Sequence, residues 1–164
     1  MKPLVVPVRY NNRTPYRDVT VDYSQSWVKD HWGALYSSYG KAPFFEFFAD
    51  YFNRVWEYKH KYLLDLNQHM LTVCLKTIQK EVTFSFSEEF EMTPENGLHN
   101  YREHILAKKS YQERKLYRPT SYTQTFGNKF EPNLSLLDLI MNEGPGAINV
   151  LQRSIGADIE QKSF

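Results

Sequence analysis

The sequence predicts one mixed α/β (α+β) domain over residues 1–164, rich in helix, with a small sheet covered by aromatic helices. Three observations predict this class. A chain of 164 residues, 41% hydrophobic and 24% charged, suits one globular domain with its own core. Large aromatic side chains are concentrated in residues 27–48, where each buried ring removes roughly 150–250 Å² from water. Apolar residues then recur at helical spacing, whereas the alternation typical of strands is confined to short runs.

Three short strands are expected. Residues 4–8 form an apolar run beside prolines, which suits an edge strand, and residues 19–23 are rich in β-branched side chains. Residues 82–87 alternate polar and apolar side chains and predict a third strand. Beyond an acidic loop, a short helix is expected at about residues 101–107, and residues 122–133 show no clear period.

A first helix is expected over residues 25–39, with Gly40 as the glycine that commonly follows a helix end. Helical periodicity continues through residues 43–79 without an internal Gly or Pro after the first turn. One continuous helix of that length would span about 55 Å at 1.5 Å per residue, which is too long for a compact domain of this size. We therefore expect a kink or loop near residues 58–62.

Two short helices are expected near the C-terminus, at residues 136–143 and 146–155. Ser135 and Asp138 have the spacing of a capping box, in which the two side chains accept hydrogen bonds from the backbone around the helix start. This arrangement would explain both residues by helix mechanics, without a catalytic role.

Composition and missing motifs exclude several functions. The net charge of +1 argues against a general nucleic-acid binder. Cys74 is the only cysteine, so no intramolecular disulfide is possible, which fits a cytoplasmic protein. The sequence contains no run of about 18 apolar residues, so no membrane span is expected. The Gly-rich phosphate loop and the common hydrolase and zinc motifs are absent, and His60 and His69 do not share a helix face, so no metal site is expected.

His31 is the candidate catalytic residue. It lies beside Asp30 on the aromatic helix, where burial or a nearby carboxylate would tune its pKa for general-base work. The commoner alternative is a half-buried histidine that only helps the helix to pack. The aromatic stretch likewise offers either core packing or stacking platforms for rings, and Tyr39 at its rim is a candidate ligand contact.

Other candidate ligand contacts lie later in the chain. Residues 102–118 carry an excess of Lys and Arg over Glu, which suits a phosphate or a sugar-nucleotide diphosphate held by Lys108 and Lys109. The alternative there is an ordinary solvated surface. The capping box does not explain Asn133 and Asn142, which either bind a ligand or fix the loop that enters the helix.

Several motifs occur together in an order and spacing that resemble one family. They are Trp27 with His31-Trp32, Tyr39-Gly40-Lys41-Ala42-Pro43-Phe44-Phe45, Leu63-Leu64 with Asn67, Lys108-Lys109, Tyr122-x-Gln124-x-Phe126, Phe130-x-Pro132-Asn133-Leu134-Ser135-Leu136-Leu137-Asp138-Leu139, and Asn142-Glu143-Gly144-Pro145. On these residues, which cover the chain from about 4 to 151, the protein resembles the bacterial WbqC-like proteins and looks most like their Bacteroides-group branch.

The resemblance implies an α/β fold and an association with surface-polysaccharide and O-antigen gene clusters, with the reaction undefined. It implies an enzyme that acts on a sugar nucleotide or transfers an activated group to a sugar, and it leaves the cofactor open. An alternative from another class is a non-catalytic binding or scaffolding protein that uses its aromatic surface. Family members usually carry some tens of residues before the element at residues 4–8, so we expect that portion to be missing here and a homo-oligomer to cover the exposed edge.

Overall fold

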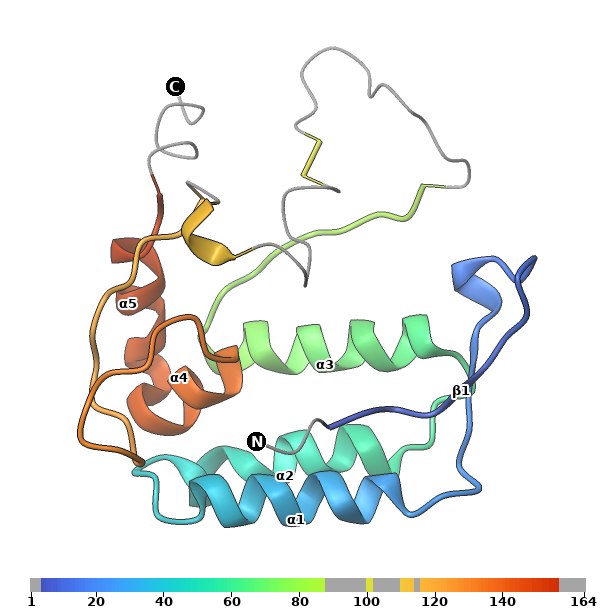
Figure 1. The fold of residues 1–164 in the computed structure, drawn as a ribbon, viewed down its shortest axis with the longest axis horizontal. Coiled ribbons are helices and arrows are strands. Elements are labelled where there is room, and N and C mark those ends of the chain that lie inside the picture. Colours follow the sequence, from blue (N-terminus) through green and yellow to red (C-terminus); the bar gives the residue numbers. More distant parts are fainter. Residues whose placement is uncertain (1–3, 88–99, 102–109, 114–115, 157–164) are drawn as a thin grey trace.

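Three helices arise from the stretch that is densest in large apolar side chains. The computed structural model describes residues 4–87, 100–101, 110–113 and 116–156. In it, α1 (Trp27–Tyr39), α2 (Phe45–Glu57) and α3 (Leu63–Thr77) lie side by side, with α2 packed on both neighbours (Figure 1). The expected break between the second and third helices is confirmed. The chain turns after α2 at Lys59, whose φ is 55°.

The centre of the core is one face of α2. Phe45, Ala49, Phe52, Val55 and Trp56 are buried along it, and the side chains of Phe52 and Val55 have no exposed surface. Complete burial of such a side chain stabilises the fold by roughly 1.5–3 kcal/mol relative to exposure.

The equivalent face of α1 consists of Trp27, His31 and Leu35, which repeat every fourth residue. The sequence analysis expected Gly40 to end this helix as a C-terminal glycine. Gly40 does follow the last helical residue, Tyr39, as the C-cap, with a right-handed φ of −59°.

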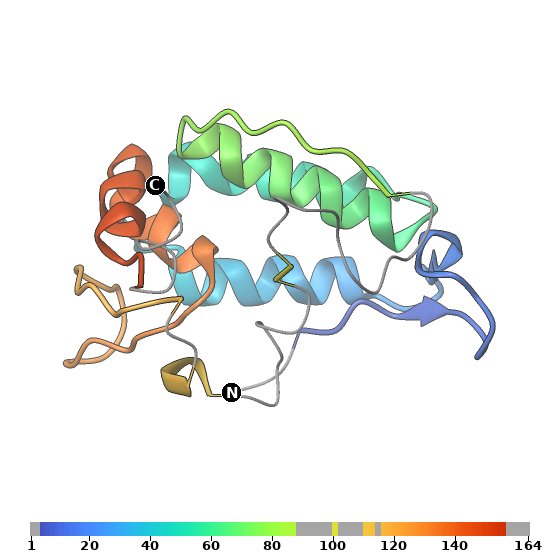
Figure 2. The same cartoon turned by 90° about the horizontal axis from the view of Figure 1, so that it is seen from above.

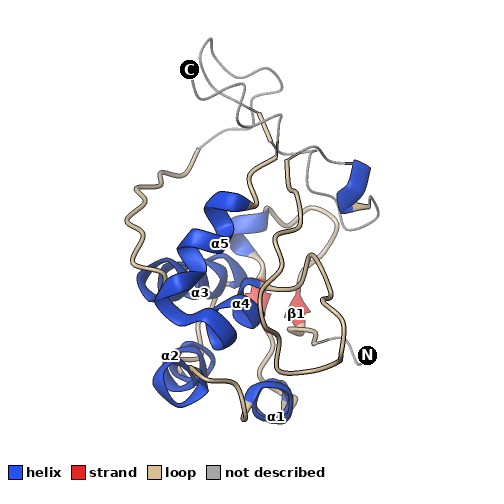
Figure 3. Cartoon of the chain, turned by 90° about the vertical axis from the view of Figure 1, so that its left-hand side faces the viewer, coloured by secondary structure: helices blue, strands red, loops and turns tan. Residues whose placement is uncertain are grey.

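The end of the three-helix layer is covered by α4 (Leu136–Glu143), a short 3₁₀ turn (Gly144–Gly146) and α5 (Ala147–Arg153). Figure 3 shows α1 and α2 nearly end-on, with α4 and α5 above them in the picture. Ile140 and Met141 of α4 are fully buried, and the carbonyl of Met141 accepts a hydrogen bond from the Phe44 N–H at 3.0 Å. Both C-terminal helices were expected, the second with slightly wider bounds.

The sheet consists of two very short antiparallel strands, β1 (Val8–Arg9) and β2 (Thr20–Val21), with Val8 opposite Val21. The Val21 N–H also bonds the Lys61 carbonyl at 2.9 Å, which fastens the ribbon beside the start of α3. The predicted helix-rich domain with a small sheet is confirmed, although both strands are shorter than expected.

The third expected strand does not form. Residues 82–87 run as an extended segment along α3 (Figure 2) and pair with no strand in the described part of the chain. Their alternation is therefore not the result of sheet formation, and Val82, Phe84 and Phe86 are exposed. The helix expected at residues 101–107 lies almost entirely outside the described residues.

Candidate functional site

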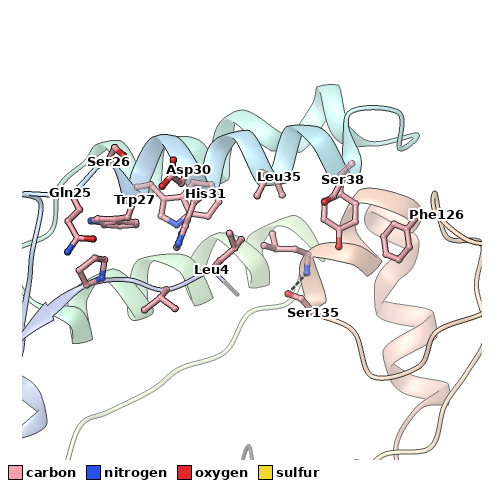
Figure 4. A pocket seen from close by; sticks show the side chains of 16 residues that line it. Leu4, Gln25, Ser26, Trp27, Asp30, His31, Leu35, Ser38, Phe126 and Ser135 are labelled. Carbon is pink, nitrogen blue, oxygen red and sulfur yellow. Dashed lines mark hydrogen bonds between the residues drawn. The ribbon is translucent and has the colours of Figure 1, made fainter. Parts of the chain in front are cut away.

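An open pocket of about 880 Å³ runs along α1. Its walls come from α1, from the N-terminal segment that leads into β1, and from the start of α4 (Figure 4). Small-molecule sites are typically about 300–1,000 Å³ and mostly apolar, with a few polar groups that orient the ligand. Here Trp27, Leu35 and Trp56 supply apolar surface from the helices, while Leu4 and Val5 supply it from the N-terminal segment.

His31 is the buried polar group in this pocket. It exposes only 6% of its surface, and its Nε2 has no hydrogen-bond partner among the described residues. The imidazole is held by edge contacts to Trp27 at 5.1 Å and Trp56 at 5.6 Å between ring centroids. In Figure 4 it projects from α1 toward Leu4. A buried polar atom without a partner costs about 1–3 kcal/mol, so a group that reached Nε2 and formed a hydrogen bond would recover that cost.

The surroundings of His31 favour its neutral form. Burial lowers the pKa of the imidazole, against smaller opposing effects of the Val5 backbone and the Asp30 charge. A histidine with a lowered pKa is unprotonated at neutral pH, so its ring can accept a proton.

The other end of the pocket is formed by Tyr39, the last residue of α1. Its ring lies 6.0 Å from that of Phe126. Burial, together with the negative charge of nearby Asp138, raises the pKa of Tyr39 to about 12. The hydroxyl therefore remains a proton donor at neutral pH.

Asp138 lies behind Tyr39 and has no exposed surface. Its Oδ2 accepts hydrogen bonds from the Tyr122 hydroxyl at 2.6 Å and from Gln124 Nε2 at 3.2 Å, and its Oδ1 accepts one from Asn142 Nδ2 at 3.3 Å. Burial and the bond to this carboxylate also raise the pKa of Tyr122. Asp138 thus gathers donors from the 122–124 segment and from its own helix.

The capping-box interpretation is half right. Ser135 Oγ accepts from the Leu137 N–H at 3.2 Å and caps α4 as expected. The Asp138 carboxylate turns instead into the interior network, because the neutral donors of Tyr122, Gln124 and Asn142 are available there. The capping-box spacing therefore did not reveal this buried network, which lies beside Tyr39 but outside the described pocket wall.

The two predicted asparagine contacts are not part of the described pocket wall. Asn142 is buried, with Nδ2 donating to the Asp138 carbonyl at 2.8 Å and Oδ1 accepting from Thr125 Oγ1 at 2.6 Å. Asn133 is exposed at a φ of 57°, and its backbone N–H donates to the Tyr117 hydroxyl at 3.2 Å. Asn142 thus joins the last turn of α4 to Thr125, and the backbone of Asn133 is held beside Tyr117; a ligand role for either residue stays a prediction. Lys108 and Lys109 lie outside the described residues.

Two histidines that the sequence spacing placed on different helix faces are in contact in the structure. His60 Nε2 and His69 Nδ1 are 2.9 Å apart, beside the ring of Tyr58. The turn before α3 folds His60 back over that helix, a contact that no shared helix face predicts. Within the part of the chain that the structure describes, no three His, Cys, Asp or Glu side chains converge as metal ligands, and no helix is long and apolar enough to cross a membrane.

Comparison with known proteins places the chain in a family. A model of the WbqC-like protein family matches residues 1–117 and 107–150. It gives no support to the expected loss of an N-terminal portion or to one particular branch. No curated protein and no solved structure matches the chain. Since the family match extends over most of the sequence, the protein belongs to the WbqC-like protein family.

Proposed function

We propose that the protein is an enzyme that binds a small metabolite in the α1 pocket and uses His31 as a general base. The supporting observation is His31, which lines a pocket of ligand size and whose buried Nε2 has no hydrogen-bond partner in the described structure. General-base catalysis by a positioned side chain contributes about 10²–10⁴-fold to a rate. A histidine kept neutral by burial is available for that role at physiological pH.

The proposed substrate is a sugar nucleotide, or a sugar that receives an activated group, in the synthesis of a cell-surface polysaccharide. The resemblance to the family suggests this class, and the pocket is compatible with it. The lining is mostly apolar, and the hydroxyls of Ser38 and Tyr39 lie along the same wall as possible hydrogen-bond partners for a sugar. The proposal includes a cytoplasmic location, to which the buried free thiol of Cys74 is suited.

Thermal unfolding with a panel of sugar nucleotides and acyl donors tests ligand binding. A compound at about 100 times its Kd adds roughly 2.7 kcal/mol, which should raise Tm by roughly 5–11 °C for a domain of this size. The compound that responds then serves as substrate for the catalytic test. His31→Asn should lower turnover by about 10²-fold or more. Lys29→Gln is the matched control, since Lys29 is an exposed residue of α1 outside the pocket wall. Unchanged turnover in His31→Asn would refute the base role.

The exposed aromatic face of α2 favours the second candidate, a binding or scaffolding protein. Phe47 is 68% exposed and Tyr51, one helical turn later, is 55% exposed. Aromatic residues are enriched in protein interfaces, and homodimerisation is one way to cover them. Light scattering should then show an oligomer that Phe47→Ser with Tyr51→Ser converts to a monomer. If the wild type is a monomer and the variant has the same mass, the homo-oligomer hypothesis is refuted.

A further inference from the structure

We infer that residues 4–7 form a movable strap over His31, and that this strap swings away at Pro7 before a ligand reaches the imidazole. The inference rests on the proposed function, because it concerns how that same site opens and closes. His31 lines the pocket, but its Nε2 is buried. A ligand therefore cannot reach this atom while every wall around it stays in place.

The helical walls around His31 are fixed. Trp27 exposes 3% of its surface, and its Nε1 donates a hydrogen bond to the Asp22 carbonyl at 3.1 Å. Trp56 lies on the buried face of α2, which packs against both α1 and α3. Because a buried aromatic ring hides roughly 150–250 Å² from water, moving either indole aside would expose a large part of the core.

The other end of the pocket does not cover His31. In Figure 4, Ser135 and Phe126 lie toward the Ser38 end of α1, away from the imidazole. Leu4 lies beside the imidazole in the same view, and the ring of His31 projects toward it. The N-terminal segment is therefore the remaining wall that can uncover the ring.

This N-terminal segment is weakly held. Within the described part of the chain, residues 4–7 make one backbone–backbone hydrogen bond, from the Asp22 N–H to the Pro7 carbonyl at 2.8 Å. Leu4 is 50% exposed and Val5 is 64% exposed. A segment with few backbone hydrogen bonds and exposed side chains opens at a smaller free-energy cost than a core helix does.

The strap has one point of attachment to the core and one pivot. Val6 is partly buried and packs against the core cluster, so its side chain holds the strap closed. β1 begins at Val8 and pairs with β2, so the fastened ribbon starts directly after Pro7. The strap also touches the imidazole, since burial lowers the pKa of His31 and a hydrogen bond with the Val5 backbone opposes that shift.

Opening of the strap exposes Nε2 to a ligand, and closure over the bound ligand excludes water from the imidazole. Exclusion of water strengthens the electrostatic interactions of a catalytic group with its substrate. An open state populated at about 0.1–10% is sufficient for ligand entry, because minor conformations of this kind are selected by binding.

Chemical modification tests the strap without any ligand. Diethyl pyrocarbonate acylates neutral imidazole nitrogens, and peptide mass spectrometry gives the rate at His31. In the wild type, His31 should react about 10- to 1,000-fold more slowly than in urea-unfolded protein, in proportion to the open state. Val6→Ala should raise this rate about tenfold, because the smaller side chain buries less apolar surface in the closed state. Val150→Ala makes the same substitution at a buried residue of α5 and is the matched control. Because local opening does not require global unfolding, the control should leave the rate at His31 within about twofold.

Three results would overturn the strap. A rate at His31 equal to that of the unfolded protein would show that the imidazole is already accessible. Equal rates in the wild type and Val6→Ala would show that the strap does not control access. Equal acceleration by Val6→Ala and Val150→Ala would show that access requires global unfolding.

If Val6→Ala does not fold, low concentrations of urea decide the question with the wild type alone. A rate at His31 that stays nearly constant supports local opening, whereas a rate that rises as steeply as global unfolding overturns it. These outcomes are distinct from failure of the proposed function. Unchanged turnover in His31→Asn refutes the base role whatever the modification rates, and a failed modification test leaves the base role to the turnover assay.

Discussion

The buried carboxylate of Asp138 accepts hydrogen bonds beside the Tyr39 end of the pocket. Its replacement by asparagine tests how much these hydrogen bonds stabilise the fold. Both carboxylate oxygens accept hydrogen bonds, Oδ2 from Tyr122 and Gln124 and Oδ1 from Asn142. In Asp138→Asn the amide NH₂ must therefore face a donor in either orientation. Removing one partner from a buried charged network typically costs 3–5 kcal/mol, whereas relief of charge burial offsets part of that loss. We expect the free energy of unfolding to fall by about 3 kcal/mol.

Thermal and urea unfolding measure this change directly. At about 2–4 °C per kcal/mol for a domain of this size, Tm should fall by roughly 6–12 °C. Asp50→Asn provides the matched control because it makes the same chemical change on the exposed side of α2, and it should shift stability by less than about 0.5 kcal/mol. Equal stability of wild type and Asp138→Asn would refute the reasoning, since it would show that the three donors do not depend on the carboxylate.

Three further predictions concern the rest of the fold. Gly144→Ala should lower the free energy of unfolding by about 3 kcal/mol, because the added Cβ would lie 2.5 Å from the Phe44 ring at a backbone φ of 55°. Gly33→Ala, which adds a Cβ in open space on α1, should instead raise the free energy of unfolding by roughly 0.5–1 kcal/mol. Urea unfolding measures both, and equal effects of the two substitutions would contradict this prediction. Because burial lowers the folded-state pKa of His31, its contribution to stability is complete above the unfolded value of about 6.5 and is lost as pH falls through the folded pKa. The free energy of unfolding should thus decrease more steeply below about pH 6.5 in the wild type than in His31→Asn. Parallel pH curves of the two proteins would contradict this prediction. Burial raises the pKa of Cys74 to about 11, so a thiol reagent should modify native protein far more slowly than urea-unfolded protein, and similar rates would show that the thiol is accessible.

Local signals in the sequence predicted local structure well. The bounds of α4 follow from Ser135 at its start and Gly144 at its end, two features that act within a single helical turn. The break after α2 followed from a length limit on the whole domain. The prediction of a strand at residues 82–87 was wrong because alternation does not show whether a neighbouring strand is available for hydrogen bonding.

The site depends on contacts across larger distances in sequence. His31 was recognised from its aromatic helix, but the solitary Nε2 arises only when Trp56 and the N-terminal segment close around α1. Asp138 was assigned to a capping box because the spacing fits, whereas its actual partner Tyr122 lies 16 residues earlier along the chain. A local rule could not reveal that competing tertiary partner.

The most direct test of a ligand site at His31 is the ¹⁵N NMR spectrum of its imidazole, recorded against pH and against each compound that responds in thermal unfolding. The structure predicts a neutral ring at pH 7 with a pKa below the ordinary value of about 6.5, and a saturable change at Nε2 when ligand is added. A ring that titrates at the ordinary value and responds to no sugar, sugar nucleotide or acyl donor would contradict the account.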